Sequence, residues 1–266
     1  MPSFFVYRKK IKNFQEKVRI YDFFANYICR GGLKFMARIE KINQKQTEEL
    51  FMLLFASEKR KDLTLSLFNA LNETDYENPD DIRVKDIEGT LFVMTKDNHY
   101  FMLVDAVNVW NKDLFLNPNI PLKFVLYTRK IYERYLHENH LNWFSTRPIY
   151  FPTPKYYCLY NGIEERDGIE TLRLSDAYEN KEHAPMEAIV HVFNLEKKQT
   201  KLNKCKALID YGHFISKLNE NQNKYSDIKQ LVDKTLEEMA EDFMLYDIFE
   251  QEKDKVIEIL REEYRD

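Results

Sequence analysis

The stretch of residues 90–137 constrains the fold most, because two short apolar segments, a turn and a long amphipathic segment follow one another in it. Residues 91–94 and 100–107 are rich in aromatic and β-branched side chains, and Thr-Lys-Asp-Asn between them is typical of a turn. These features predict a β-hairpin whose second strand runs into Asp105. Apolar side chains recur every three or four residues over residues 122–135, and this spacing predicts an amphipathic helix with Pro121 near its first turn.

Two helices are expected before the hairpin, because apolar residues recur at helical spacing over residues 47–71 with a break at 57–60. Thr47 is the expected N-cap, and Glu48 lies in the first turn, where the helix dipole favours an acid. A loop and the first strand of the sheet are expected next, at residues 72–81 and 81–85.

The second half of the chain continues the sheet and then becomes helical. Short apolar runs predict further strands at residues 156–160 and 187–194, and a brief extended piece and a turn between them at 172–176. Helical patterns follow at residues 204–218, 225–249 and 252–264. The order predicts an α/β fold in which a mixed sheet core is flanked by helices and ends in a helical C-terminal tail. This is the shape of a restriction-endonuclease-like domain, and other mixed folds share it.

Charge is distributed unevenly, although the formal net charge is only −4. Residues 1–46 hold eleven Lys or Arg against three acids, whereas residues 219–266 hold fifteen acids against seven bases. We divide the chain into a basic N-terminal extension at 1–43, a core at 44–200 and a helical region at 201–266. The extension is interpreted as a packed or loose helical segment, as an arm that contacts DNA, or as an upstream reading of a frame that starts at Met36.

The cysteines and the hydropathy of the sequence indicate the cellular compartment. The three cysteines are far apart and show neither CxxC nor Cys/His spacing, so they indicate no disulfide framework and no zinc site. No run approaches the roughly 18–20 apolar residues of a membrane span, and the N-terminus shows no signal-peptide pattern. We therefore expect a cytoplasmic protein that has no membrane partner.

Several phrases, in order, resemble the recombination-promoting nuclease (Rpn) and putative transposase family of the PD-(D/E)XK superfamily. The similarity covers the chain from about Met36 to the C-terminus. It is carried by these phrases: Leu-Val-Asp-Ala-Val-Asn-Val-Trp at 103–110, Ile-Pro-Leu-Lys at 120–123, Tyr-Glu-Arg-Tyr at 132–135, Leu-Tyr-Asn-Gly at 159–162 and Leu-Arg-Leu-Ser-Asp at 172–176. The helical patterns at both ends of this region also resemble the family.

The resemblance implies a Mg²⁺-dependent DNA endonuclease. In the family, an Asp on the first hairpin strand and a Glu on the second, followed two residues later by Gln or Lys, hold the metal that polarises phosphate and activates water. Carried onto this sequence, the second-strand acid is Asp105 and its partner two residues on is Val107, which has no polar group. The first-strand Asp falls near Leu91, which leaves Glu88 or Asp86 as substitutes.

The resemblance also suggests Glu48 as an accessory acid and Lys123 as a basic group that contacts phosphate. Our expectation is therefore a degraded catalytic site with Asp105, Glu48 and Glu88, of which Asp105 and Glu88 would hold Mg²⁺ if the site were active. Lys123, Arg129 and Lys130 are the expected nucleic-acid contacts. Each residue also has a structural interpretation: Asp105 as a loop-capping or solvated acid, Glu48 as a first-turn acid, and the three bases as the solvated face of a helix.

Three interpretations of function remain open from the sequence. They are an active endonuclease, a nuclease-like module that binds DNA, another protein or a second copy of the chain without catalysis, and a degenerating remnant of a mobile element without a present role. The aromatic pairs at 143–144, 150–151 and 156–157 are interpreted as core and loop packing rather than as platforms for stacking bases.

Overall fold

The computed structural model describes residue 42 and residues 44–109, 116–162, 169–195, 201–239 and 241–261. The predicted basic extension, except for Ile42, lies outside these described residues, as does Trp110.

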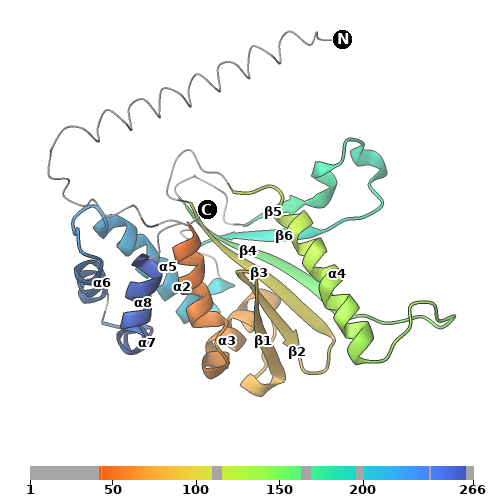
Figure 1. Cartoon of the computed structure of the whole chain (residues 1–266), viewed down its shortest axis with the longest axis horizontal. Helices are drawn as coiled ribbons and strands as arrows, with labels where there is room; N and C mark the ends of the chain where they lie inside the picture. The colour runs from red at the N-terminus through yellow and green to blue at the C-terminus, as the bar shows by residue number, and fades with distance from the viewer. Residues whose placement is uncertain are drawn as a thin grey trace, which may run out of the picture. The chain divides into compact units, whose positions relative to one another are not determined.

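The described residues form a six-stranded mixed sheet with the spatial order β1-β2-β3-β4-β6-β5 (Figure 1). Strands β1, β2 and β3 form an antiparallel meander, β3, β4 and β6 run parallel, and β5 pairs antiparallel with β6 at the far edge. The strands are β1 (Ile82–Ile87), β2 (Thr90–Thr95), β3 (Tyr100–Val109), β4 (Thr153–Gly162), β5 (Ile169–Arg173) and β6 (Ile189–Asn194).

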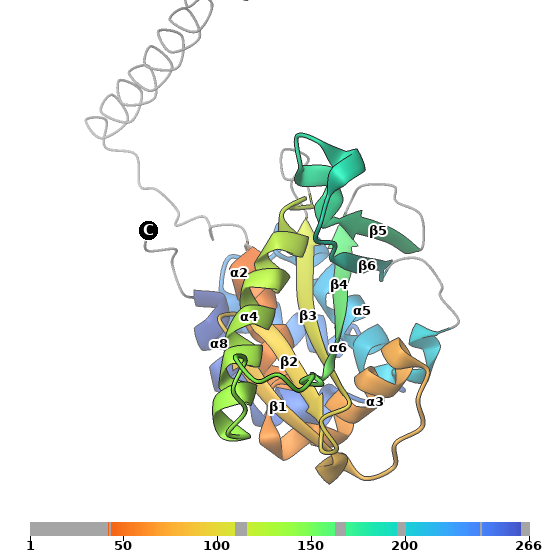
Figure 2. The same cartoon turned by 90° about the vertical axis from the view of Figure 1, so that its right-hand side faces the viewer.

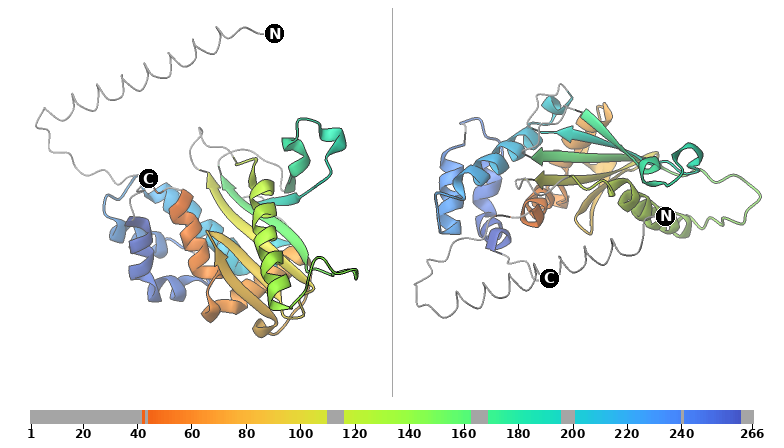
Figure 3. Two further views of the ribbon diagram at one scale, coloured as in Figure 1. Left: turned by 45° about the vertical axis from the view of Figure 1, so that its right-hand side comes forward. Right: turned by 90° about the horizontal axis from the view of Figure 1, so that it is seen from above.

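Helices cover both faces of this sheet. Helix α4 lies on one face, and α3 and α5 lie on the other (Figure 2). The C-terminal helices α6, α7 and α8 gather beside α2 and α5 (Figure 3). The helices are α2 (Gln44–Phe55), α3 (Lys61–Asn72), α4 (Ile120–Glu138), α5 (Lys206–Asn221), α6 (Ile228–Glu237), α7 (Tyr246–Gln251) and α8 (Lys253–Arg261).

Two hydrophobic cores follow from the alternation of side chains along the strands. Met102, Val104 and Ala106 of β3 face the core that includes α2, α3 and the C-terminal helices. Phe101, Leu103 and Val107 face the smaller core beneath α4. Because the larger core contains residues from both sides of residue 200, the C-terminal helices share their packing with the sheet.

The predicted α/β class, the mixed sheet flanked by helices and the helical C-terminal region are confirmed. The hairpin and α4 lie where the sequence placed them, with Pro121 in the first turn of α4. Thr47 is not the N-cap of α2, because the helix already begins at Gln44 and the Thr47 hydroxyl donates to the Gln44 carbonyl at 2.7 Å.

The single helix predicted over residues 225–249 is also wrong, since α6 ends at Glu237 and α7 begins at Tyr246. The backbone N–H of Met244 instead donates to the buried carboxylate of Asp210 at 2.8 Å. A buried carboxylate needs such donors, and this contact holds residue 244 outside a helix. Among the described residues, no helix is both long enough and apolar enough to cross a membrane.

Candidate functional site

Asp105 lies inside β3 rather than at its end, because β3 continues to Val109 beside the parallel strand β4. Its side chain is only 8% exposed, so it is neither the solvated acid nor the loop cap that the structural interpretation of the sequence offered. Its side chain faces α4, as those of Leu103 and Val107 do. A buried carboxylate requires hydrogen-bond donors, which its neighbours on β2 and α4 supply.

The hairpin register brings Thr90, and not Leu91, against Asp105. Leu91 pairs with Val104, so Thr90 lies one step further along β2, and its hydroxyl donates to Asp105 Oδ1 at 2.6 Å. Leu91 points to the opposite face of the sheet and is buried in the larger core. The position facing Asp105 across the hairpin is therefore a hydroxyl group.

Lys123, in the first turns of α4, completes the surroundings of Asp105. Its ammonium group lies 2.9 Å from Asp105 Oδ2 and 3.1 Å from Oδ1. Val107, two residues after Asp105, is 5% exposed and packs in the core beneath α4. The Lys123 ammonium group thus contacts both oxygens of the Asp105 carboxylate, and the residue two positions after Asp105 has no polar side chain.

Glu88 lies in the tight turn between β1 and β2, where Glu88 and Gly89 both adopt positive φ, 52° and 81°. This is the backbone of a two-residue type I′ hairpin turn, which is strained at a non-glycine residue. The Glu88 carboxylate accepts hydrogen bonds from Tyr127 at 3.1 Å and from Lys130 at 3.2 Å. The Lys130 contact, followed by that of Tyr127, lowers the pKa of Glu88.

Tyr127 connects this turn to Asp105. Burial and the hydrogen bond to Glu88 raise the pKa of Tyr127 to about 12, and the negative charge of Asp105 adds to that rise. The Tyr127 ring also lies beneath two ammonium groups, with Lys123 at 5.7 Å and Lys130 at 5.4 Å from its centroid. Asp105 contacts Lys123, Glu88 contacts Lys130 and Tyr127, and both lysines lie over the Tyr127 ring, so one network of contacts includes both carboxylates.

Glu48, on α2, belongs to the same electrostatic neighbourhood. Burial raises the pKa of Glu48, and the charge of Asp105 raises it further, while the hydrogen bond from Gln44 and the charge of Lys123 oppose the rise. The bond from Gln44 Nε2 to Glu48 Oε1 is 2.6 Å long. The structure thus brings Glu48 into the electrostatic range of Asp105, although the two residues come from separate elements.

The raised pKa of Glu48 predicts a pH-dependent effect of Glu48→Gln. The folded protein binds this proton more tightly than the unfolded chain does, so the stability that Glu48 contributes is present at low pH and falls as the pH rises through the interval between the two pKa values. Glutamine is neutral throughout and can still accept from Gln44. We expect the variant to have the larger free energy of unfolding at pH 7, with the difference vanishing below about pH 4.

Urea denaturation at several pH values measures this effect. Glu49→Gln is the matched control, because its carboxylate makes an exposed ion pair with Lys45 whose loss should cost less than about 1 kcal/mol. A Glu48→Gln variant that is less stable than the parent at pH 7 would mean that the charged form of Glu48 is the stabilising one.

The donor set does not fit a Mg²⁺ centre. Both oxygens of Asp105 are bonded to the Lys123 ammonium, and those of Glu88 to Tyr127 and Lys130. Within the described ranges, no group of three or more His, Cys, Asp or Glu side chains is arranged to hold a metal ion. Mg²⁺ requires several oxygen ligands in near-octahedral geometry, and the arrangement around Asp105 offers ammonium groups in their place.

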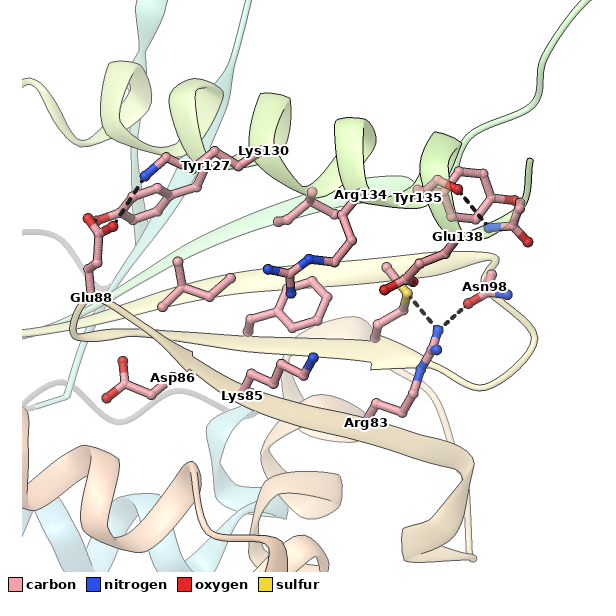
Figure 4. A pocket seen from close by; sticks show the side chains of 15 residues that line it. Arg83, Lys85, Asp86, Glu88, Asn98, Tyr127, Lys130, Arg134, Tyr135 and Glu138 are labelled. Carbon is pink, nitrogen blue, oxygen red and sulfur yellow. Dashed lines mark hydrogen bonds and ion pairs between the residues drawn. The ribbon is translucent and has the colours of Figure 1, made fainter. Parts of the chain in front are cut away.

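A groove of about 600 Å³ runs between α4 and the β1–β2 edge of the sheet (Figure 4). We call it the α4 groove. Figure 4 shows Arg134 of α4 and Lys85 of β1 extending into it from opposite sides, with Lys130 and Glu88 at one end. Arg83 also lines the groove and donates to the sulfur of Met94 and to Asn98.

A second groove, of about 1000 Å³, lies between α2, α8 and the Glu88–Gly89 turn. Its charged lining is dominated by acids: Glu48, Glu49, Glu58, Asp86, Glu88, Glu252 and Glu258. This acidic surface disfavours a polyanion, whereas the α4 groove carries cations on both of its walls.

The three expected nucleic-acid contacts on α4 therefore lie in different settings. Lys123 pairs with the buried Asp105, and Lys130 lines the α4 groove beside Glu88. Arg129 is 70% exposed, pairs with Glu133 and is not among the residues that line the groove. Whether any of them contacts nucleic acid stays a prediction.

Sequence reasoning gave no role in the site to Thr90, Tyr127 or Lys85. Thr90 could have been found by extending the first hairpin strand by one residue, because adjacent residues of a strand lie on opposite faces and Thr90, unlike Leu91, shares the face of Asp105. The spacing of seven between Tyr127 and Arg134 places both on one side of α4, but only the structure shows that this side borders a groove.

In a comparison with known proteins, no protein-family model, no curated protein and no solved structure matched this chain.

Proposed function

We propose that this protein is a restriction-endonuclease-like domain that binds nucleic acid without cleaving it. The observation that carries the proposal is the ion pair between Asp105 and Lys123, in which an ammonium group holds both oxygens of the carboxylate that the family resemblance puts at the centre of the site. A resident side-chain cation neutralises the carboxylate in the way that a metal ion would. It supplies neither open coordination positions nor an activated water.

The residues around the ion pair support the loss of catalysis. Val107 is buried and apolar where the family pattern has Gln or Lys, and Leu91, near which the pattern's Asp falls, is buried in the larger core, so that the Thr90 hydroxyl is the group on β2 that faces Asp105. A Thr hydroxyl that donates to Asp105 is a sound structural partner for a buried acid. The substitutions are thus compatible with one another in a packed, non-catalytic arrangement.

The α4 groove supports nucleic acid as the ligand. Lys85 and Arg134 make no hydrogen bond or ion pair to any described residue, so their charges are available to a ligand in the groove. Polyanion binding depends on cations of this kind, whose contacts with phosphate release counterions. The acidic residues Asp86, Glu88 and Glu138 also line the groove, and they restrict where a phosphate can lie.

The test of this proposal is cleavage and binding measured on one preparation. Plasmid DNA is incubated with the protein and Mg²⁺ or Mn²⁺, with Asp105→Ala and Asp105→Asn as references. We expect no cleavage above the level of the variants. Metal-dependent cleavage that both substitutions abolish would overturn the non-catalytic assignment.

The binding readout is the affinity for a short duplex as a function of salt. Affinity should fall steeply with salt, and Arg134→Ala should weaken binding and lower the magnitude of the salt slope by about 1. Arg129→Ala is the matched control on the same helix, outside the groove. An equal loss in both variants would move the contact surface to the exposed face of α4, and binding without salt dependence would contradict a phosphate contact.

An endonuclease that retains activity is the second candidate function. The observation that favours it is the approach of Glu48, with its raised pKa, to Asp105 and Lys123. This places a protonatable acid, a carboxylate and an ammonium group together. The cleavage assay separates the two candidates, because only the second predicts products that disappear in Asp105→Asn.

A further inference from the structure

The segment 141–151, which connects α4 to β4, exposes a set of large aromatic rings. Trp143 is 67% exposed, and Phe144 and Tyr150 are each 83% exposed. The loop projects from the end of α4, away from the sheet (Figure 1, Figure 3). The interpretation as core packing is confirmed for Tyr156 and Tyr157, which are buried, and corrected for Trp143, Phe144 and Tyr150. Phe151, at 39%, packs with its ring 4.6 Å from that of Tyr132.

The loop is shaped by its own hydrogen bonds. The Asn142 side chain accepts from the N–H of Phe144 at 2.9 Å, and the Ser145 hydroxyl accepts from the N–H of Arg147 at 3.1 Å. At the base of the loop, the Tyr132 hydroxyl donates to the Pro152 carbonyl at 2.9 Å. The exposed rings are therefore carried on a defined backbone that is anchored to α4.

The charged residues in and near the loop indicate the kind of ligand that these rings contact. Residues 139–163 contain no Asp or Glu but include Arg147 and Lys155, in a chain with 44 acids and 40 Lys or Arg. The α4 groove, with Lys85 and Arg134 on its walls, reaches Asn139, two residues before the loop begins. Exposed aromatic rings that flank a cation, Arg147, and are free of acids match a ligand that has both a phosphate backbone and flat bases.

We propose that this aromatic loop is a stacking platform for the unpaired bases of single-stranded nucleic acid, whose backbone continues into the α4 groove. The proposal rests on the proposed function, since it names the form of nucleic acid that the groove receives. Bases of a duplex are stacked on one another and cannot reach these rings, whereas an unpaired strand can present each base to a ring.

The test compares the affinities of a labelled oligo-dT and of a duplex of equal length for the full chain by fluorescence anisotropy. The variant Trp143→Ala/Phe144→Ala/Tyr150→Ala removes three exposed rings and should keep the parental circular dichroism spectrum and melting temperature. We expect it to lose about 5- to 150-fold in single-strand affinity, the effect of losing one stacked base. Duplex affinity should change by less than about twofold.

Three further measurements define the contact. Tyr246→Ala, an exposed aromatic of α7, is the matched control and should bind as the parent does. Arg147→Ala should lower the magnitude of the salt slope by about 1, whereas the ring variant leaves the slope unchanged. The chain has two tryptophans, so a Trp110→Phe background makes Trp143 the sole reporter, and its fluorescence should be quenched by oligo-dT.

Unchanged single-strand affinity in the ring variant would overturn the stacking platform. So would an effect of the ring variant confined to binding of phosphatidylserine-containing vesicles, or confined to self-association measured by light scattering. Duplex binding that depends on Arg134, without a single-strand effect of the rings, would leave the proposed function standing and remove only this inference. Failure to bind either oligonucleotide would remove both.

Discussion

Lys123→Met should destabilise the protein by about 2–3 kcal/mol, because it leaves the carboxylate of Asp105 buried without its cation. Removing one partner of a fully buried ion pair costs about 3–5 kcal/mol. The Lys123 side chain is 36% exposed, so water can partly replace its ammonium group, and we lower the expected loss accordingly. Methionine retains most of the aliphatic length of lysine, so the charge is the main property that changes.

Asp105→Asn in the Lys123→Met background is expected to recover most of the loss. Asparagine carries no charge, and its Oδ1 can still accept the hydrogen bond of the Thr90 hydroxyl. Lys130→Met is the matched control on the same helix: its ion pair with Glu88 is exposed on both sides, and its loss should cost less than about 1 kcal/mol. Urea denaturation followed by circular dichroism measures all three variants.

The result decides what Lys123 does in the free protein. A loss in Lys123→Met similar to that in Lys130→Met would mean that the ammonium is not fixed on Asp105. It would then be available for phosphate, as the family resemblance suggests. A large loss that the double variant repairs would establish that the ion pair between Asp105 and Lys123 stabilises the fold.

Local patterns in the sequence were sufficient for the elements that surround the site. The turn between residues 95 and 98, the β-branched and aromatic flanks and Pro121 each favour one local conformation, so the hairpin and α4 were predicted at their places. The register of the two hairpin strands was not predicted. The sequence did not show whether Leu91 or its neighbour Thr90 faces Asp105, and these two positions differ by only one residue. In a strand, one residue moves a side chain from one face of the sheet to the other.

Tertiary contacts decided the features that the sequence did not predict. No proline or glycine lies between residues 225 and 249, so the helical pattern appeared continuous. In the structure the Met244 N–H donates to the Asp210 carboxylate, outside a helix, and the pattern is divided into two helices. The aromatic pairs of the loop 141–151 have the composition of a core, and only the fold shows that no element covers Phe144 and Tyr150 among the described residues. The absence of Asp and Glu from residues 139–163 was the sequence signal that could have distinguished this exposed loop from a packed one.

Phe214→Ala should reduce the free energy of unfolding by about 3–5 kcal/mol, the largest loss that we expect from a single substitution in this chain. Phe214, on α5, is fully buried, and its ring stacks on that of Phe249 with centroids 4.3 Å apart and an interplanar angle of 23°. Alanine leaves a cavity between α5 and α7 that rigid helices cannot close. Phe214→Leu, which fills most of that volume, should lose less.

The same variant tests whether the C-terminal helices and the sheet unfold together. Phe214 belongs to the core cluster that also contains Val104 of β3 and Leu159 of β4, so a cavity at this position weakens packing that both regions share. Hydrogen exchange should show that amides of β4 and of α5 lose protection by similar free energies. Loss of protection in α5 alone, with β4 unchanged, would show that the region 201–266 is a separate cooperative unit. The sheet and the α4 groove would then fold without the helical tail.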